Sequence, residues 1–524
     1  MKTVKRLGFL LIIIVMILTT APEVSETTAL ESNEAIAENS AKIKDTLIMA
    51  VRGDPPDWGP NSNNSQNFWA LKKQIYETLV VFDKEGIVQP CLAESWEFAD
   101  DLTLIFHLRK GVFFHNGEEL KASDVLFSFK KISESKDASP GVANLDFEKT
   151  VAIDDYTVKV VTKQPFSTQI KYFEWPLTSI SSEKAFNDSG GDYNADPLGA
   201  GGTGPYTIVE FVPGDRVVLA AFEDYWEKGK PYVKNLIIRI ITESTTRGLE
   251  LESGGVDIAL ELNAVDITGL RDQVDTDVVL DPSAQTNYLS FQNTHKYIND
   301  PLIRKAIVYA IDWDTAVSAA FGDTGIRAIG FLAPSVEGFA SDIKIIQYDP
   351  EMAKKLLIDA GYPDGFEGIK MYTDTVTERR NLAEIMQSYL ADVGIGLELV
   401  SMEQAAYVTA YKNGEHDLML FGLTATTGEP GKPFAFFTIG NSYENVWGWG
   451  NQEFTDLVSQ ASVTLDDTAR NNLWHKAQEM LNEDLPMYPV YYRSIASGIR
   501  TNVKGFENNP SFESPLLKNV YFGE

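Results

Sequence analysis

Cysteine and histidine are scarce in this sequence. Cys91 is the only cysteine among 524 residues, and the five histidines stand at positions 107, 115, 295, 416 and 475. A lone thiol excludes an intramolecular disulfide and any metal or iron–sulfur site built from several cysteines. No two histidines have the His-x-x-x-His spacing of a helical zinc site. We therefore expect no metal and no cofactor, and we expect Cys91 to be a small core residue.

Basic residues are also few. The sequence carries 45 Lys and Arg against 75 Asp and Glu, which gives a formal net charge of −30. Contact with nucleic acid phosphates or with anionic lipid head groups requires an excess of basic side chains, so both classes of partner are excluded. Acidity of this degree is typical of a solvated surface that keeps a protein soluble.

The usual catalytic motifs are absent. There is no Gly-x-Ser-x-Gly elbow, and the glycine-rich run 196–206 has neither the Lys-Ser/Thr nor the GxGxxG pattern of a phosphate-binding loop. The acidic pairs Asp100-Asp101 and Asp154-Asp155 fall in predicted turns, where sequence neighbours do not share a face as paired glycosidase carboxylates must. Nothing here supports an enzymatic function; a secreted enzyme is the alternative that a turnover assay would reveal.

The one long apolar run stands at the N-terminus. Three basic residues within the first six precede the apolar residues 7–18, which predicts an export signal over residues 1–21. The run is shorter than the ~20 residues of a membrane-spanning helix, and an uncleaved anchor is the alternative. Residues 22–44 are rich in Glu, Ser, Thr and Ala and predict a disordered spacer. We expect the protein to be exported, to the periplasm or the outer face of the membrane.

The length exceeds one ordinary hydrophobic core and predicts two or three domains. Between Lys110 and Asn194 the pattern is of α+β type, and helices and strands are expected on both sides of that range. The elements expected up to about residue 285 are strands at 46–51, 102–108, 236–241 and 256–259, a hairpin at 151–162, and helices at 68–79, 244–251 and from a cap at Ser123 or Asp124 to Ile132.

From Asn287 the pattern becomes a regular helix–strand alternation, which predicts a second α/β lobe. Asp300-Pro301 and Asp349-Pro350 each combine a capping carboxylate with a proline suited to a first helical turn. The other elements expected are helices at about 378–393, 404–412, 453–463 and 467–483, and strands at 397–400, 417–423 and 487–493. Because the last strand and the tail return to the first lobe, more than one strand joins the lobes, which predicts a hinge with a cleft.

The stretch 89–132 carries the most specific pattern, QPCLAESWEFADDLTLIFHLRKGVFFHNGEELKASDVLFSFKKI. It resembles the family 5 extracellular solute-binding proteins, the peptide/nickel-type receptors of ABC importers, whose pattern runs L-A-x-S-W, F-x-L-R-x-G-V-x-F-H-x-G and A-x-D-V-x-F-S. The run GTGPY at 202–206 matches a further motif of that family. The matching residues of the first block are Leu92, Ala93, Ser95, Trp96, Phe106, Leu108, Arg109, Gly111, Val112, Phe114, His115, Gly117, Ala122, Asp124, Val125, Phe127 and Ser128.

The resemblance implies an α/β, two-lobed periplasmic-binding-protein-like fold of the large class, with an extra subdomain, mixed sheets and a hinge between the lobes. The domains then are lobe I at 45–285 with an inserted subdomain at about 84–195, lobe II at 286–486, and a return to lobe I at 487–524. The implied function is that of an extracytoplasmic receptor that captures an oligopeptide or similar small solute and delivers it to an ABC permease and its ATPase. We expect a monomer.

Aromatic residues are the candidates for the ligand surface. Trp447 and Trp449 stand among glycines, and Trp58, Phe68 and Trp69 are expected to face them from the first lobe. Such rings stack on sugars, peptide side chains and aromatic ligands, with packing in the core as the equal alternative.

Two further positions bear on the ligand. Peptide receptors of the resembled family carry Gly-Trp-x-x-Asp where this chain has Gly422-Leu-Thr-Ala-Thr426. The hydroxyl of Thr426 cannot give the charged pairing that a ligand ammonium requires in a dry cleft, which argues against free-amine peptides. Arg379 lies near the position where those receptors place a carboxylate-binding arginine. Oligosaccharide is the rival ligand class, nickel chelates are less favoured, and a ligand-sensing or chaperone-like surface protein is the alternative outside transport.

Overall fold

The computed structural model describes residues 44–523 apart from positions 56, 61–65, 84–85, 136–138, 200, 442–443 and 510–513. Asp45–Glu524 forms one compact unit, described here by itself. The predicted export signal at 1–21, and the predicted spacer at 22–44 except for its last residue, lie outside the described residues. Within the described part of the chain, no helix combines the length and the apolar character that a membrane span requires.

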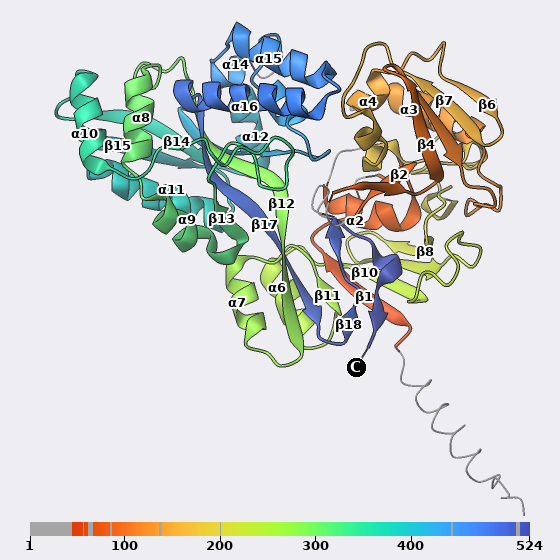
Figure 1. The fold of residues 1–524 in the computed structure, drawn as a ribbon. Coiled ribbons are helices and arrows are strands. Elements are labelled where there is room, and N and C mark those ends of the chain that lie inside the picture. The colour runs from red at the N-terminus through yellow and green to blue at the C-terminus, as the bar shows by residue number, and fades with distance from the viewer. Residues whose placement is uncertain are drawn as a thin grey trace, which may run out of the picture. The chain divides into compact units, whose positions relative to one another are not determined.

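A mixed sheet, 11-stranded in the described residues, runs through both lobes (Figure 1). Its order is β15-β14-β16-β12-β17-β11-β1-β10-β9-β8, with β13 also paired to β17. The half that belongs to lobe I contains β1 (Thr46–Val51), β8 (Tyr206–Val212), β9 (Arg216–Ala221), β10 (Asn235–Ile240) and β11 (Ile258–Ala259). The half that belongs to lobe II contains β13 (Gly325–Arg327), β14 (Phe366–Thr373), β15 (Ile395–Ser401) and β16 (Leu418–Thr424).

Two long strands join the lobes. β12 (Thr276–Phe291) and β17 (Met487–Arg500) pair antiparallel from Thr276↔Arg500 to Ser290↔Met487, with register shifts between Pro282 and Thr286 and between Asn287 and Tyr288. Both strands therefore enter the cores of both lobes, and β12 passes without a break through the predicted boundary at 285/286. A bulge bends a strand pair locally. Because the first shift lies at the predicted boundary between the lobes, a hinge would bend there. The expectation of more than one crossing strand is confirmed.

Lobe I has its main core beneath its half of the sheet and a second core in the inserted subdomain. The subdomain contains the sheet β4-β5-β7-β6 covered by α3. Its elements are β2 (Val80–Phe82), β3 (Val88–Pro90), β4 (Ala93–Asp100), β5 (Thr103–Leu108), α3 (Ala122–Ser133), α4 (Pro140–Ala143), β6 (Val151–Asp154), β7 (Thr157–Val161), η1 (Gln169–Phe173), η2 (Pro176–Thr178) and α5 (Glu183–Asp188). Around them lie α2 (Gln66–Ile75), η3 (Pro197–Gly199), α6 (Ser244–Glu252) and α7 (Ala264–Arg271).

The predicted cap of α3 is corrected by the structure. The N-cap is Lys121, because the helix already begins at Ala122. Asp124 is the third helical residue, and its Oδ2 accepts the backbone N–H of Lys121 at 2.9 Å. The side chain of Asp124 thus accepts the backbone N–H of the N-cap residue, as the third helical residue does in a capping box.

Lobe II has two cores, which lie on the two sides of its half of the sheet. Its helices are α8 (Pro301–Tyr309), α9 (Trp313–Phe321), α10 (Pro350–Asp359), α11 (Thr377–Ala391), α12 (Gln404–Lys412), α13 (Gly431–Ala435), α14 (Glu444–Trp447), α15 (Gln452–Val463) and α16 (Asp467–Asp484), with the short η4 (Gly322–Thr324). Both Asp-Pro predictions are confirmed: Asp300 accepts from the backbone of Leu302 and Asp349 from that of Met352.

The C-terminal tail packs against the core that contains β1, β8, β9 and β10. Leu517 and Val520 are fully buried in that core, and Gln74 of α2 donates to Pro515 O at 2.8 Å. The tail contains β18 (Val503–Lys504), β19 (Asn508–Asn509), β20 (Ser514–Pro515), η5 (Leu517–Asn519) and β21 (Tyr521–Phe522).

Candidate functional site

Side chains of the two lobes meet along one contact surface, which we call the seam. It consists of the segment 167–175 of lobe I, around η1, and of residue 337 with the segments 426–432 and 462–470 of lobe II. Ser167 donates its backbone N–H and its hydroxyl to the carbonyl of Ser462, at 3.1 and 3.2 Å. Figure 1 shows the corresponding view: α15 and α16 of lobe II face α4, which packs on η1.

A shared carboxylate links the lobes at one end of the seam. Glu337 Oε2 lies 2.8 Å from Lys171 Nζ of lobe I, while Glu337 Oε1 accepts from Arg470 of lobe II at 2.5 and 2.8 Å. Burial by itself would raise the pKa of Glu337, but Lys171 and Arg470 outweigh it and hold the pKa below its ordinary value. Glu337 is therefore ionised at neutral pH and joins a cation from each lobe.

A second carboxylate lies in the middle of the seam. Tyr172 of lobe I donates its hydroxyl to Glu429 Oε1 at 3.2 Å. The same oxygen accepts from Thr427 Oγ1 at 3.1 Å, and Glu429 Oε2 accepts from the backbone N–H of Gly431 at 2.7 Å. Burial raises the pKa of Glu429, and these hydrogen bonds together with the charge of Lys171 oppose that rise. Both oxygens of Glu429 are thus held by the protein itself.

A lysine and a tryptophan meet across the seam beside Glu429. Lys432 Nζ lies 4.7 Å from the centre of the Trp175 ring and 3.5 Å from Thr426 Oγ1. Burial lowers the pKa of Lys432 to about 8, although the charge of Glu429 acts against this. Cation–π contacts of this kind gain strength when they are withdrawn from water.

An aromatic cluster supports the lobe I side of the seam. Trp69, Tyr172 and Trp175 pack together with Phe82 and Leu177. Beneath them, Lys73 of α2 lies 2.6 Å from Glu174, whose carboxylate is fully buried and whose pKa burial raises to about 7. An ion pair in such a place is stable only with both partners present, so it fixes the segment that carries Trp175.

Two of the predicted site residues, Thr426 and Trp69, lie at or next to the seam. Thr426 contacts Lys432, and Trp69 belongs to the aromatic cluster behind Trp175. Phe68 belongs to the same helix as Trp69, α2, and its side chain lies outside the described residues.

Arg379 is engaged by its own lobe. Its Nη1 lies 2.7 Å from Asp374 Oδ2, a buried carboxylate. Burial would lower the pKa of Arg379, but Tyr491, Asp374 and Tyr407 together raise it. This charge is already balanced within lobe II.

The other three tryptophans of the prediction lie in packed surroundings, Trp58 in lobe I and Trp447 and Trp449 together in lobe II. Trp58 is buried in the main core of lobe I, with Phe211 edge-on at 4.8 Å. Trp447 is 1% exposed and stacks on Phe437 at 5.7 Å in a core of lobe II. Trp449 packs at the edge of that core and donates to Asp484 at 3.3 Å. The structure thus brings Trp69, and not Trp58, close to the seam, and these contacts agree with the core-packing alternative for Trp58 and Trp447.

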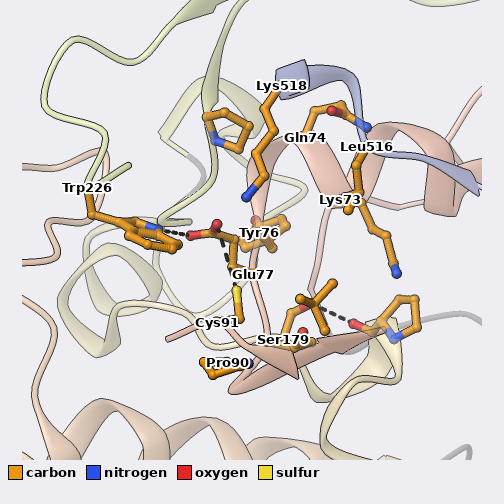
Figure 2. A pocket seen from close by; sticks show the side chains of 14 residues that line it. Lys73, Gln74, Tyr76, Glu77, Pro90, Cys91, Ser179, Trp226, Leu516 and Lys518 are labelled. Carbon is orange, nitrogen blue, oxygen red and sulfur yellow. Dashed lines mark hydrogen bonds between the residues drawn. The ribbon is translucent and has the colours of Figure 1, made fainter. Parts of the chain in front are cut away.

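A separate cavity of about 50 Å³ lies inside lobe I (Figure 2). Glu77 lies at its wall and accepts from Tyr225 at 2.7 Å, Trp226 at 2.9 Å and Thr203 at 2.9 Å. Burial raises the pKa of Glu77, against the opposing effect of the Lys518 charge and of these donors. The cavity adjoins a wider pocket of about 620 Å³ that shares Trp226 and Lys518 with it.

Cys91 also lines this cavity and is buried, as predicted for a core residue. Burial raises the pKa of its thiol, so the sulfur stays protonated beside Glu77. Among the described residues, no group of three or more His, Cys, Asp or Glu side chains is placed to hold a metal ion.

Sequence reasoning missed most of the seam. The residues that it did not single out are Lys171, Tyr172, Trp175, Glu337, Glu429, Lys432 and Arg470. The available sign was the density of charge and proline after Thr426, in the run Thr-Gly-Glu-Pro-Gly-Lys at 427–432. No spacing rule connects that run with residues 171–175, since the two meet only through the fold.

Known proteins resemble this chain along most of its length. The dipeptide-binding protein of Escherichia coli K12 is 28% identical over 498 residues, covering 89% of this chain and 92% of the relative. The di/tripeptide-binding protein 2 of Pseudomonas aeruginosa UCBPP-PA14 is 30% identical over 500 residues, covering 89% and 93%. The solved periplasmic binding protein DppA of Helicobacter pylori, in complex with the peptide STSA, superposes with a TM-score of 0.78 at 26% identity and covers 93% of this chain and 100% of its own.

The family model described as bacterial extracellular solute-binding proteins, family 5 Middle, matches residues 88–445. That range includes the block at 89–132, the run GTGPY, and the segment 426–432 of the seam. The two-lobed α/β fold and the family motifs agree with this match. The chain belongs to the family 5 bacterial extracellular solute-binding proteins.

Proposed function

We propose that the protein is the extracytoplasmic receptor of an ABC importer, and that it captures an oligopeptide or a similar small solute between its lobes. The observation that carries the proposal is the seam, where Tyr172 and Lys171 of lobe I reach Glu429 and Glu337 of lobe II. Family membership and the di- and tripeptide binding named for two relatives support it. A permease and an ATPase are the partners that such a receptor requires.

The geometry suits capture by closure. β12 and β17 are hydrogen-bonded along most of their length, so a bend near residues 282–286 would move one lobe as a body against the other. The seam contacts exist only when the lobes are together, and they stabilise the closed form. A ligand shifts the population toward that form only by as much as it binds the closed form more tightly. Such a cycle forms and breaks no covalent bond, and we propose that the protein is not an enzyme.

Small-angle scattering tests the closing mechanism. We expect the radius of gyration to fall when a ligand is added to the exported protein stripped of its ligand by partial unfolding and refolding. The variant Lys171→Met should show a larger radius without ligand, because Lys171 supplies the charged contact across the seam to Glu337. Lys130→Met, on the exposed face of α3, is the matched control. If no ligand that binds reduces the radius, closure is not the mechanism.

Native mass spectrometry of the freshly purified protein identifies the ligand class. A retained peptide supports the proposal directly. A retained oligosaccharide would show that the receptor captures a sugar and not a peptide. A chain that binds unfolded proteins and no small solute would fit a chaperone-like role, and would contradict both.

A further inference from the structure

The segment 426–432 carries one carboxylate and one ammonium, those of Glu429 and Lys432. Its one carboxylate, Glu429, already accepts from Tyr172, Thr427 and Gly431. In the described residues, no carboxylate lies within ion-pair distance of Lys432. The nearest oxygen partner of its ammonium is Thr426 Oγ1, at the long distance of 3.5 Å. The ammonium of this half-buried lysine, with three N–H donors, therefore has one weak acceptor and an aromatic face among the described residues.

Trp175 adds a further donor on the opposite side. The residue is 3% exposed, and its Nε1 is buried without a hydrogen-bond partner in the described part of the chain. A buried indole N–H without an acceptor costs free energy. It lies in the ring over which Lys432 Nζ is placed, so a cation and an unsatisfied N–H donor occupy the same part of the seam.

Thr426 supplies no negative charge to the seam. A receptor that pairs with a ligand ammonium needs an anionic acceptor there, and Thr426 offers a neutral hydroxyl that can itself donate. A ligand ammonium at this place would meet Lys432, which is still mainly protonated at neutral pH because burial lowers its pKa only to about 8. Like charges out of water repel strongly. At this place the charge of Lys432, although opposed by that of the nearby Glu429, disfavours a ligand cation.

We propose that the ligand group bound at Thr426, Lys432 and Trp175 is a carboxylate. This rests on the proposed receptor function, and it assigns the ligand class at one end of the site. The ligand is a peptide that places there either its own C-terminal carboxylate or an acidic group that blocks its amino end. An ammonium at this place weakens binding.

Four tripeptide libraries with the same randomised side chains distinguish these sources. The first has both ends free, the second is N-acetylated with a free carboxylate, the third has a free amine and a C-terminal amide, and the fourth is N-succinylated with a C-terminal amide. Native mass spectrometry reads which molecules the refolded protein retains, and calorimetry measures the affinity of the retained ones. We expect the second or the fourth library to bind best, and the third to bind roughly tenfold or more weaker, the ratio expected for one charge-assisted hydrogen bond.

Variants separate a ligand contact from a simple link between the lobes. Lys432→Met keeps an unbranched apolar side chain and removes the charge, and it should lower carboxylate affinity about tenfold while leaving the third library unchanged or improved. Thr426→Asp combined with Lys432→Met should reverse the preference toward the third library. Lys476→Met, at an exposed position of α16, is the control and should change neither.

Two results would contradict the carboxylate proposal. A preference of the native protein for the third library, or a loss in Lys432→Met that is equal for all libraries, overturns the carboxylate proposal and leaves the receptor function standing. Binding of none of the four libraries contradicts the peptide-receptor function itself, and the carboxylate proposal falls with it.

Discussion

Tyr172 donates its hydroxyl to Glu429 Oε1 at 3.2 Å, and 257 positions separate the two residues in the sequence. Tyr172 lies in η1 of the inserted subdomain, and Glu429 precedes α13 of lobe II. The contact therefore depends on the packing of lobe I against lobe II, since neither residue can reach the other by local folding.

Tyr172→Phe removes this hydroxyl and keeps the ring. A hydrogen bond to a charged group contributes about 1.5–3 kcal/mol, so we expect ligand affinity to fall roughly tenfold or more. Thermal stability should change little, because the ring still packs against Trp175. Calorimetric titration measures the affinity, with Tyr348→Phe at an exposed site as the control. Unchanged affinity would show that this hydrogen bond does not contribute to closure.

The Lys171–Glu337 contact predicts a salt effect on binding. Both side chains are partly exposed, so dissolved salt screens their attraction. We expect Lys171→Met to weaken ligand binding by about 1 kcal/mol at low salt, the upper range for exposed ion pairs. We also expect the variant to lose most of the salt dependence of the native protein. Affinities measured at low and high ionic strength test this; parallel salt curves for the two proteins would contradict it.

His416 predicts a pH dependence of stability. It is fully buried, and neither ring nitrogen has a hydrogen-bond partner among the described residues. Burial lowers its pKa from the ordinary 6.5 to about 4. The unfolded chain therefore takes up a proton first as the pH falls, so the stabilisation is present above pH 6.5 and is lost between pH 6.5 and 4.

His416→Leu removes that titration. The loss in the native protein amounts to on the order of 3 kcal/mol over the whole range. The difference in unfolding free energy between native protein and variant should shift by this amount from pH 7 to pH 4. Denaturant unfolding at several pH values measures it, and a constant difference would show that His416 does not titrate in this way.

Glu77 is expected to stabilise the fold of lobe I. Its carboxylate accepts from Tyr225, Trp226 and Thr203, so Glu77→Ala leaves three donors without their acceptor. We expect a loss of about 3 kcal/mol or more in unfolding free energy. The exposed change Glu94→Ala is the control and should be nearly neutral. Equal melting temperatures for both variants would contradict the role of Glu77.

Trp447 and Trp449 provide a test of the stacking hypothesis. Because Trp447 is enclosed by the core of lobe II, Trp447→Ala should cost about 3–5 kcal/mol of stability. If it serves packing alone, ligand affinity at a temperature where the variant is folded should stay the same. Trp449→Ala should cost less, since this ring is partly exposed. A selective loss of affinity in either variant would instead support the ligand-stacking hypothesis.

Local features were predictable because they depend on neighbours in the chain. The helix caps at Asp300 and Asp349 follow from an acidic side chain before a proline, and the strand at 46–51 from its apolar run. The start of α3 was wrong by two or three residues, because Asp124 can serve a helix either as its cap or from its first turn.

The site was less predictable. Thr426 was identified through a departure from a family motif, and Trp69 as one of the aromatic residues expected to face the cleft. Arg379 was predicted because it lies near the carboxylate-binding arginine of the resembled receptors. Asp374 balances its charge, and the sequence does not reveal this pairing. Residues such as Trp175 and Glu337 belong to no motif, and their role depends on which segments the lobes bring together.

The sequence alone determined the family, through the block at 89–132, and it determined the class of fold through its helix–strand pattern. Tertiary structure decided which charges meet across the seam. Glu337 lies between Lys171 and Arg470, and Lys432 lies over Trp175 without a carboxylate partner in the described residues. The physical reason is that periodicity and capping act over a few residues, whereas the charge presented to a ligand is a sum over segments that only the crossing strands β12 and β17 bring into contact.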